Sequence, residues 1–269
     1  MGHIFSMTER TWSLTQLFDY YELRARVIPA VLVFLPLVLS SISVTYVLSN
    51  LVPWATGSGL LALAVTYALS FIVRALGRRV EISLWAKWDG PPSTRFMRWA
   101  DDFFSPDTKQ EYHEAIRSEF GICLKDETEE HRNPSQADKL IMDAFRQVRS
   151  FVRIEDGKGV WNAHNAEYGF LRNIFGSRFL WLTLALLGTI LCGYLFYITG
   201  IGVTVVSVII NGFLALLALL CCSLHTQMIE FIKQVADRYA ESTWGSFITI
   251  HRRRSKRGSI SAQQPGKHT

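Results

Sequence analysis

The residues best suited to chemistry in this chain are tryptophans and cations in the segment 84–99. This segment holds three tryptophans, a lysine, two arginines and a Gly-Pro-Pro turn, and it follows a long apolar run. Aromatic faces together with cationic groups stack on nucleobases and neutralise phosphates, so the composition indicates a nucleotide or single-stranded nucleic-acid site. The ordinary alternative is tryptophans at the headgroup level of a membrane and a proline-fixed elbow below them. The candidate ligand contacts here are Lys87, Trp88, Arg95, Arg98 and Trp99.

A second group of polar residues occupies the segment Trp161–Asn173. If this segment is helical, its hydrogen-bonding side chains share faces, such as the face of Asn165, Tyr168 and Arg172. A rigid helix that joins such a site to the following apolar run would transmit ligand occupancy to the membrane. The alternative is a polar cluster that ties the central block to the elbow. The candidate ligand contacts in this segment are His164, Asn165 and Arg172.

The sequence lacks the motifs of common catalytic centres. GxSxG, HExxH, GxxxxGK[ST] and GxGxxG do not occur, and the acidic stretch Asp126–Glu130 is most simply a solvated loop. We therefore expect no enzyme, no cofactor and no metal site. The enzymatic alternative is a lipid-modifying activity at the membrane surface that uses His164 or the pair Asp101 and Asp102.

The composition indicates a membrane protein. Of the 269 residues, 49% are apolar and only 19% are charged, and the mean hydropathy is +0.17. The net charge of +5 is local, because the segment from His251 onward holds six basic residues and no acidic one. The basic excess therefore does not imply binding of nucleic acid by the whole protein. The four cysteines form no CxxC motif, which fits a reducing interior.

Four uncharged apolar runs have the length needed to cross a bilayer. They are Val27–Leu48, Trp54–Val73, Phe179–Ile198 and Val203–Leu224. The expected fold is an all-α membrane protein with four transmembrane helices, arranged as two hairpins that flank a small helical cytoplasmic domain. The expected parts are an amphipathic N-terminal helix (1–26), hairpin 1 (27–80), a cytoplasmic sensor domain (81–178), hairpin 2 (179–224), a cytoplasmic helix (225–250) and a basic disordered tail (251–269).

Charges next to the apolar runs predict the orientation of the chain. Arginines flank the ends that face the central block, whereas the connectors Ser49–Pro53 and Thr199–Gly202 carry no charge. By the positive-inside tendency, both termini and the central block face the cytoplasm. We expect a multi-pass membrane protein.

Polar residues inside the runs are few. No run contains a charged residue, which argues against a transporter coupled to ions or protons. Four helices are too few to enclose a pore, so any pore would form between the subunits of a homo-oligomer. The residues expected to face a pore or another helix are Thr183, Ser207 and Asn211.

Local signals predict several helices of the central block. Ser105-Pro106 and Asn133-Pro134 are helix starts, and Gly121 is a helix stop. A helix from Val160 is expected to continue into the third apolar run. The segment 225–250 keeps an apolar stripe that must be covered either by the central domain of its own chain or by the same helix of other subunits.

With this architecture and its LWAKWDGPPSTRFMR and HNAEYGFLRN segments, the chain resembles the membrane effector of the Hailong anti-phage system. The resemblance implies a homotetrameric ion channel of a bacterial inner membrane, paired with a nucleotidyltransferase. It implies that opening of the channel kills or arrests the infected cell. It also implies that a single-stranded oligodeoxyadenylate made by the partner enzyme keeps the channel shut. The leading hypothesis is therefore a ligand-gated, membrane-depolarising effector. The alternative is a membrane-anchored scaffold that recruits a cytosolic partner through its acidic central domain.

Overall fold

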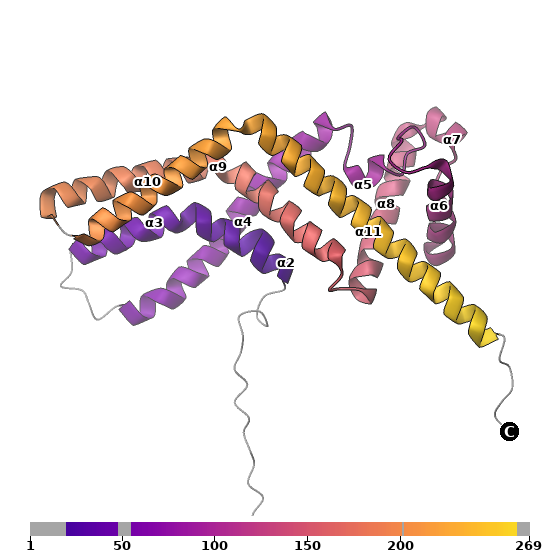
Figure 1. Cartoon of the computed structure of the whole chain (residues 1–269), viewed down its shortest axis with the longest axis horizontal. Helices are drawn as coiled ribbons and strands as arrows, with labels where there is room; N and C mark the ends of the chain where they lie inside the picture. The colour runs from indigo at the N-terminus through magenta and orange to yellow at the C-terminus, as the bar shows by residue number, and fades with distance from the viewer. Residues whose placement is uncertain (1–19, 48–54, 201, 263–269) are drawn as a thin grey trace, which may run out of the picture.

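The computed structural model describes residues 20–47, 55–200 and 202–262, and all regular structure in these ranges is helical. Figure 1 shows an elongated molecule in which the apolar helices gather at one end and the short helices of the central block lie at the other. Two long helices join the ends. The expectation of an all-α protein is confirmed for the part of the chain described.

Three helices are long and apolar enough to cross a membrane, so this is a membrane protein. The first, Leu23–Val47, begins with a π-helical turn, η1 (Leu23–Val27), and continues as α3 (Ile28–Val47). The others are α9 (Val160–Thr199) and α10 (Gly202–Ser223). The prediction that the helix from Val160 continues into the third apolar run is confirmed by the 40 residues of α9.

The second predicted span, Trp54–Val73, coincides with the first part of α4 (Ala55–Lys87). This helix is not among the three spans found in the described residues, so the layout of two hairpins stays a prediction. The short helix α2 (Tyr20–Glu22) precedes η1, and the rest of the predicted amphipathic helix, residues 1–19, lies outside the described residues.

Glycines allow α9 to lie very close to α4 and to η1. A Cβ atom added at Gly176 would lie 2.7 Å from the backbone of Gly77, and one added at Gly169 would lie 2.7 Å from the Cβ of Ala25. Side chains at these positions would hold the helices apart. Gly169 and Gly176 are two turns apart on α9, so one face of this helix contacts both neighbours.

The central block contains α5 (Pro92–Arg95), α6 (Pro106–Phe120), α7 (Glu127–Arg132) and α8 (Pro134–Glu155). The predicted helix boundaries are confirmed by their cap geometry. Side-chain oxygens of Ser105 and Asn133 accept hydrogen bonds from the backbone N–H groups three residues on, and Gly121 ends α6 with a φ of 68°.

The expectation of a solvated loop at Asp126–Glu130 is wrong. Asp126 caps α7 by accepting a hydrogen bond from the N–H of Glu129 at 2.8 Å. Glu130, in the middle of this helix, is buried and accepts a hydrogen bond from the N–H of Trp99 at 2.9 Å. A run of acids thus forms a helix because one acid caps its start and another finds a buried donor.

The helix α11 (His225–Ala262) packs against both hydrophobic cores of the protein. Its first part, with Ile232 and Ala236, belongs to a core shared with α3, α9 and α10, and its second part, with Trp244 and Phe247, covers α6 and α8. The apolar stripe of this helix is therefore covered by its own chain, and by the apolar helices as well as by the central domain, which was one of the two expected alternatives.

The expectation of a disordered tail from residue 251 is also wrong over 251–262, where α11 continues. The guanidinium of Arg252 contacts the carboxylate of Glu111 in bidentate fashion, at 2.7 and 2.6 Å, and Arg254 contacts Glu119 at 2.9 Å and Glu155 at 2.7 Å. Acidic residues of α6 and α8 thus neutralise the basic end of α11 and allow it to remain helical.

The close crossing of α4 and α9 generates a test. Replacing Gly176→Ala should destabilise the protein by roughly 1–3 kcal/mol, because the added methyl group forces the two backbones apart. Thermal unfolding of the detergent-purified protein would measure the change. In the control Gly193→Ala, on the same helix, the new Cβ meets nothing within 4 Å, so stability should stay equal or rise by up to ~1 kcal/mol. Equal melting temperatures for the two variants would contradict the close crossing.

Candidate functional site

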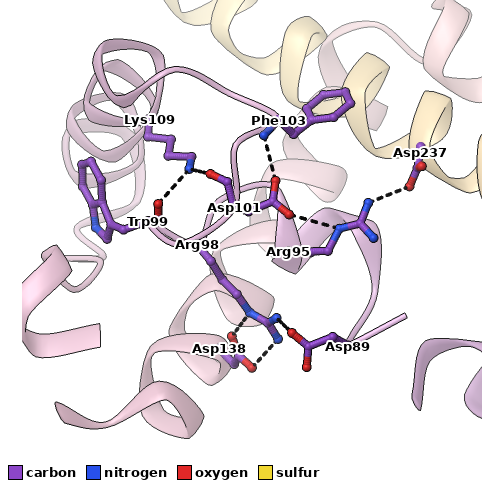
Figure 2. A network of polar contacts seen from close by, with 9 residues as sticks. All are labelled: Asp89, Arg95, Arg98, Trp99, Asp101, Phe103, Lys109, Asp138 and Asp237. Carbon is purple, nitrogen blue, oxygen red and sulfur yellow. Dashed lines mark hydrogen bonds and ion pairs between the residues drawn. The ribbon is translucent and has the colours of Figure 1, made fainter. Parts of the chain in front are cut away.

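The elbow, residues 88–99, follows the end of α4 at Lys87. Its two arginines, which were candidate ligand contacts, form ion pairs that hold it in place. Figure 2 shows the Arg98 guanidinium between two carboxylates, Asp138 at 2.8 and 2.9 Å and Asp89 at 2.6 Å. The hydrogen bond with Asp138 and the charge of both acids raise the pKa of Arg98. Its charge is therefore already neutralised inside the protein.

Arg95 has the same kind of role on the other side of the elbow. Its guanidinium lies 3.2 Å from Asp101 and 3.4 Å from Asp237 of α11, and these contacts are seen in Figure 2. Burial raises the pKa of Asp237, and the charge of Arg95 opposes that rise. Arg95 thus connects the elbow to α11.

The tryptophans of the elbow are occupied as well. Trp88 is buried in the core, and the Trp99 indole N–H donates to the carbonyl of Lys125 at 2.9 Å. Of the five candidates in this segment, only Lys87 is exposed without a contact among the described residues. The five residues do not form one ligand surface, and their geometry favours the elbow interpretation.

Lys109 and His113, which belong to no motif of the sequence, pack against the elbow. Lys109 is 2% exposed, and its ammonium donates to the carbonyls of Trp99 and Asp101. Burial lowers the pKa of Lys109. The ring of His113 lies against Trp99 at 5.1 Å, and burial, aided by the charge of Lys109, lowers its pKa to about 4. The available signal was their helical spacing with the buried residues Tyr112 and Ile116 of α6.

Arg172 lies in a buried ion pair where α9 crosses α4. Its guanidinium contacts the Glu81 carboxylate at 2.6 Å and lies over the ring of Tyr168 at 5.5 Å. The other oxygen of Glu81, which is 2% exposed, accepts from Arg78 at 2.5 Å. Arg172 therefore fastens α9 to α4 and is not an accessible ligand contact.

The next residue, Asn173, fastens α9 to the first span. Its side-chain amide is fully buried and donates to the carbonyl oxygen of Ala25 at 2.6 Å. The α-helical donor to that carbonyl would be the N–H four positions on, which is missing because that residue is Pro29. Asn173 thus supplies the hydrogen bond that a proline removes at the start of the span.

Within the spans, the candidates Ser207 and Asn211 lie between helices of one chain. Ser43 and Ser207 share a hydrogen bond at 2.7 Å, and the Asn211 amide lies 3.8 Å from the Cys192 sulfur. Asn211 is fully buried. Thr183, in contrast, is exposed on α9. The polar groups of α3, α9 and α10 therefore hold the bundle together.

His164 and Asn165 line two different hollows, because adjacent residues of a helix point about 100° apart. His164 lines a groove of about 840 Å³ between α9 and α11, where its Nδ1 lies 3.1 Å from the Ser242 hydroxyl. We name this hollow the α9–α11 groove. Its further lining residues include Glu155, Arg238, Glu241, Ser246, Thr249, Arg253, Arg254 and Arg257. Asn165 lines a smaller cleft, together with Arg26 of η1 and Arg74 of α4.

Comparison with known protein families, curated proteins and solved structures finds no match for this chain. Within the described residues, no group of three or more His, Cys, Asp or Glu side chains is arranged to hold a metal ion. Functional argument for this protein therefore depends on its own geometry.

The buried pair of Glu81 and Arg172 makes a prediction about coupling. Replacing Arg172→Leu alone should cost about 3–5 kcal/mol of stability, because it leaves a carboxylate buried beside only a half-exposed arginine. The double variant with Glu81→Leu should recover a large part of that loss. A double-mutant cycle on thermal unfolding measures the coupling. Strictly additive effects of the two substitutions would show that the pair does not interact.

The environment of His113 predicts a pH dependence. The pKa of His113 is lowered from 6.5 to about 4 in the folded protein, so below pH 6.5 the unfolded chain binds the proton first. The neutral His113 contributes up to about 3 kcal/mol to the free energy of unfolding. This contribution is complete above pH 6.5 and is lost as the pH falls towards 4.

As the pH is lowered from 6.5 to 4, the melting temperature of His113→Gln should therefore fall less steeply than that of the natural protein. The exposed His131→Gln provides the matched control, with the natural slope expected. Equal slopes for all three proteins would contradict the buried neutral state of His113.

Proposed function

We propose that this protein is an oligomeric, ligand-gated ion channel of a bacterial inner membrane, with its central block in the cytoplasm. In this proposal the first part of α4 also crosses the membrane, as the second span along the chain, and α9 and α10 are the third and fourth spans. Two hairpins then flank the cytoplasmic domain. The resemblance noted above adds a role in anti-phage defence, in which flux through the channel depolarises the infected cell.

The observation that carries the proposal is the course of the two helices that line the α9–α11 groove. Helix α9 runs unbroken from the groove to the far end of the third span, and α11 begins directly after the fourth span ends at Ser223. A ligand that changes the distance between these helices in the groove would shift their membrane ends as rigid bodies. This is the mechanical requirement for gating from the cytoplasm.

The chemistry of the groove suits a nucleotide. Arg253 and Arg257 are exposed and make no ion pair among the described residues, so they are available to phosphates. The hydroxyls of Ser242 and Ser246 and the carboxylate of Glu241 can hydrogen-bond a base or a sugar. A site with both cationic and acceptor groups suits a ligand that carries both phosphates and base edges, such as the oligodeoxyadenylate implied by the resemblance.

The pore of the proposed channel forms between subunits. Polar groups inside one bundle contact one another, as Ser43 and Ser207 do, so they hold the helices of a single chain together. The exposed face of α9 carries hydroxyl groups at Thr183, Tyr194 and Tyr197. The exposed large side chains of α10 are hydrocarbon only, which suits lipid. We therefore place α9 next to the shared axis of a tetramer.

Flux through liposomes tests the proposal. Purified full-length protein in liposomes loaded with potassium should release it faster than protein-free liposomes, and short oligodeoxyadenylate on the cytoplasmic side should change the rate. Arg253→Gln with Arg257→Gln should weaken that response about tenfold or more, as expected for loss of two charge-assisted phosphate contacts. The detergent-extracted protein should have a mass that is a multiple of 30.6 kDa.

The matched control removes the same charge elsewhere. Arg117→Gln with Arg132→Gln changes two exposed arginines of α6 and α7 that do not line the groove, and it should leave the response intact. Liposomes that stay tight under every condition would favour the membrane-anchored scaffold. A strictly monomeric protein would exclude the shared pore.

A further inference from the structure

A second hollow, of about 570 Å³, lies where the central block meets the first span and α4. We name it the arginine cleft. Four segments line it: the chain around η1, helix α4, the C-terminal half of α8 and the start of α9. The lining residues with charged or polar side chains are Tyr21, Glu22, Arg26, Arg74, Arg146, Arg149, Ser150, Arg153, Asn162 and Asn165.

The lining of the arginine cleft has a net positive charge. Five arginines line it, with one carboxylate, Glu22, which is 2.8 Å from Arg26. Arg146 is also paired, at 2.8 Å, with Asp143, which lies outside the lining. Three of the five, Arg146, Arg149 and Arg153, lie on one face of α8 at helical spacing, beside the stripe that packs into the core. Like charges that converge in this way repel one another, so the cleft favours an anion.

The cleft lies at the edge of the membrane. Arg26 is in the first turns of the candidate span Leu23–Val47, and Arg74 directly follows Val73, the last residue of the second uncharged run. Both side chains therefore lie at the level where a helix leaves the hydrocarbon, and this is the level of lipid phosphates. The arginines of α8 reach the same hollow from the cytoplasmic side.

We propose that the arginine cleft binds the phosphate of an anionic phospholipid headgroup, held between Arg74 of α4 and the arginines of α8. Guanidinium groups bind phosphate oxygens in bidentate fashion, and Asn162 and Asn165 add neutral donors. Basic pockets between membrane helices on the cytoplasmic side are suited to such headgroups. Whereas carboxylates and hydroxyls stand among the arginines of the α9–α11 groove, the one carboxylate that lines this cleft, Glu22, is already paired with Arg26. The proposal requires membrane embedding but not ion conduction.

Native mass spectrometry of the delipidated, full-length protein tests the proposal. Dioleoyl-phosphatidylglycerol should bind at least about tenfold more tightly than dioleoyl-phosphatidylcholine, which has the same chains but no net charge. Arg74→Gln with Arg149→Gln should weaken phosphatidylglycerol binding about tenfold or more, with phosphatidylcholine binding unchanged. The control Arg117→Gln with Arg132→Gln removes the same charge outside the cleft. It should change the affinity for either lipid by no more than about twofold.

A soluble arm of the same experiment identifies the source of the phosphate. Inorganic pyrophosphate at millimolar concentration should not displace phosphatidylglycerol if the acyl chains also contribute to binding. Pyrophosphate that binds tightly in a cleft that shows no preference between the two lipids would overturn the lipid assignment in favour of a soluble phosphate compound. Equal weakening by the cleft variant and the control would overturn the site itself. The lipid preference of the natural protein is measured without any variant, so a misfolded variant does not decide the result.

Discussion

The structure depends on the pairing of polar groups that are buried where the membrane helices meet the central block. A charge or a free carbonyl at this depth is costly unless a partner reaches it. Two consecutive residues of α9 supply both partners, since Arg172 neutralises Glu81 of α4 and Asn173 caps the carbonyl of Ala25. The close glycine contact between α4 and α9 is what brings these partners within reach. The position of α9 then determines where the remaining helices can pack.

Local patterns in the sequence predicted much of the fold, because helices are set by short-range signals. The apolar runs, the caps at Ser105 and Asn133 and the continuity of α9 follow from hydropathy, capping chemistry and the absence of a helix breaker. The occupied state of Arg98 could not be predicted in this way. Its partner Asp138 lies 40 residues away in the sequence. The sequence alone does not indicate whether a basic side chain is paired or free. The helical end of α11 was missed for the same reason, since its acidic partners belong to α6 and α8.

The two hollows differ in the charged groups that line them. Several carboxylates stand among the arginines of the α9–α11 groove, whereas five arginines and a single carboxylate line the arginine cleft. The first turns of α9 separate them, so that His164 belongs to one and Asn165 to the other. A displacement of this part of α9 therefore changes both hollows at once. Because the helix is unbroken, the displacement also reaches the apolar part of α9.

The contacts of Arg172 and Asn173 also constrain how the protein is made. Glu81 precedes its partner by 91 residues and Ala25 precedes its partner by 148, so both are synthesised long before the groups that satisfy them. Until α9 has been synthesised, Arg78 is the one ion-pair partner of Glu81 among the described residues, and the carbonyl of Ala25 has no side chain of α9 to accept from. The contacts that fasten α9 to α4 and η1 therefore form only after residues 172 and 173 have left the ribosome, which makes assembly of this bundle a late step of biogenesis.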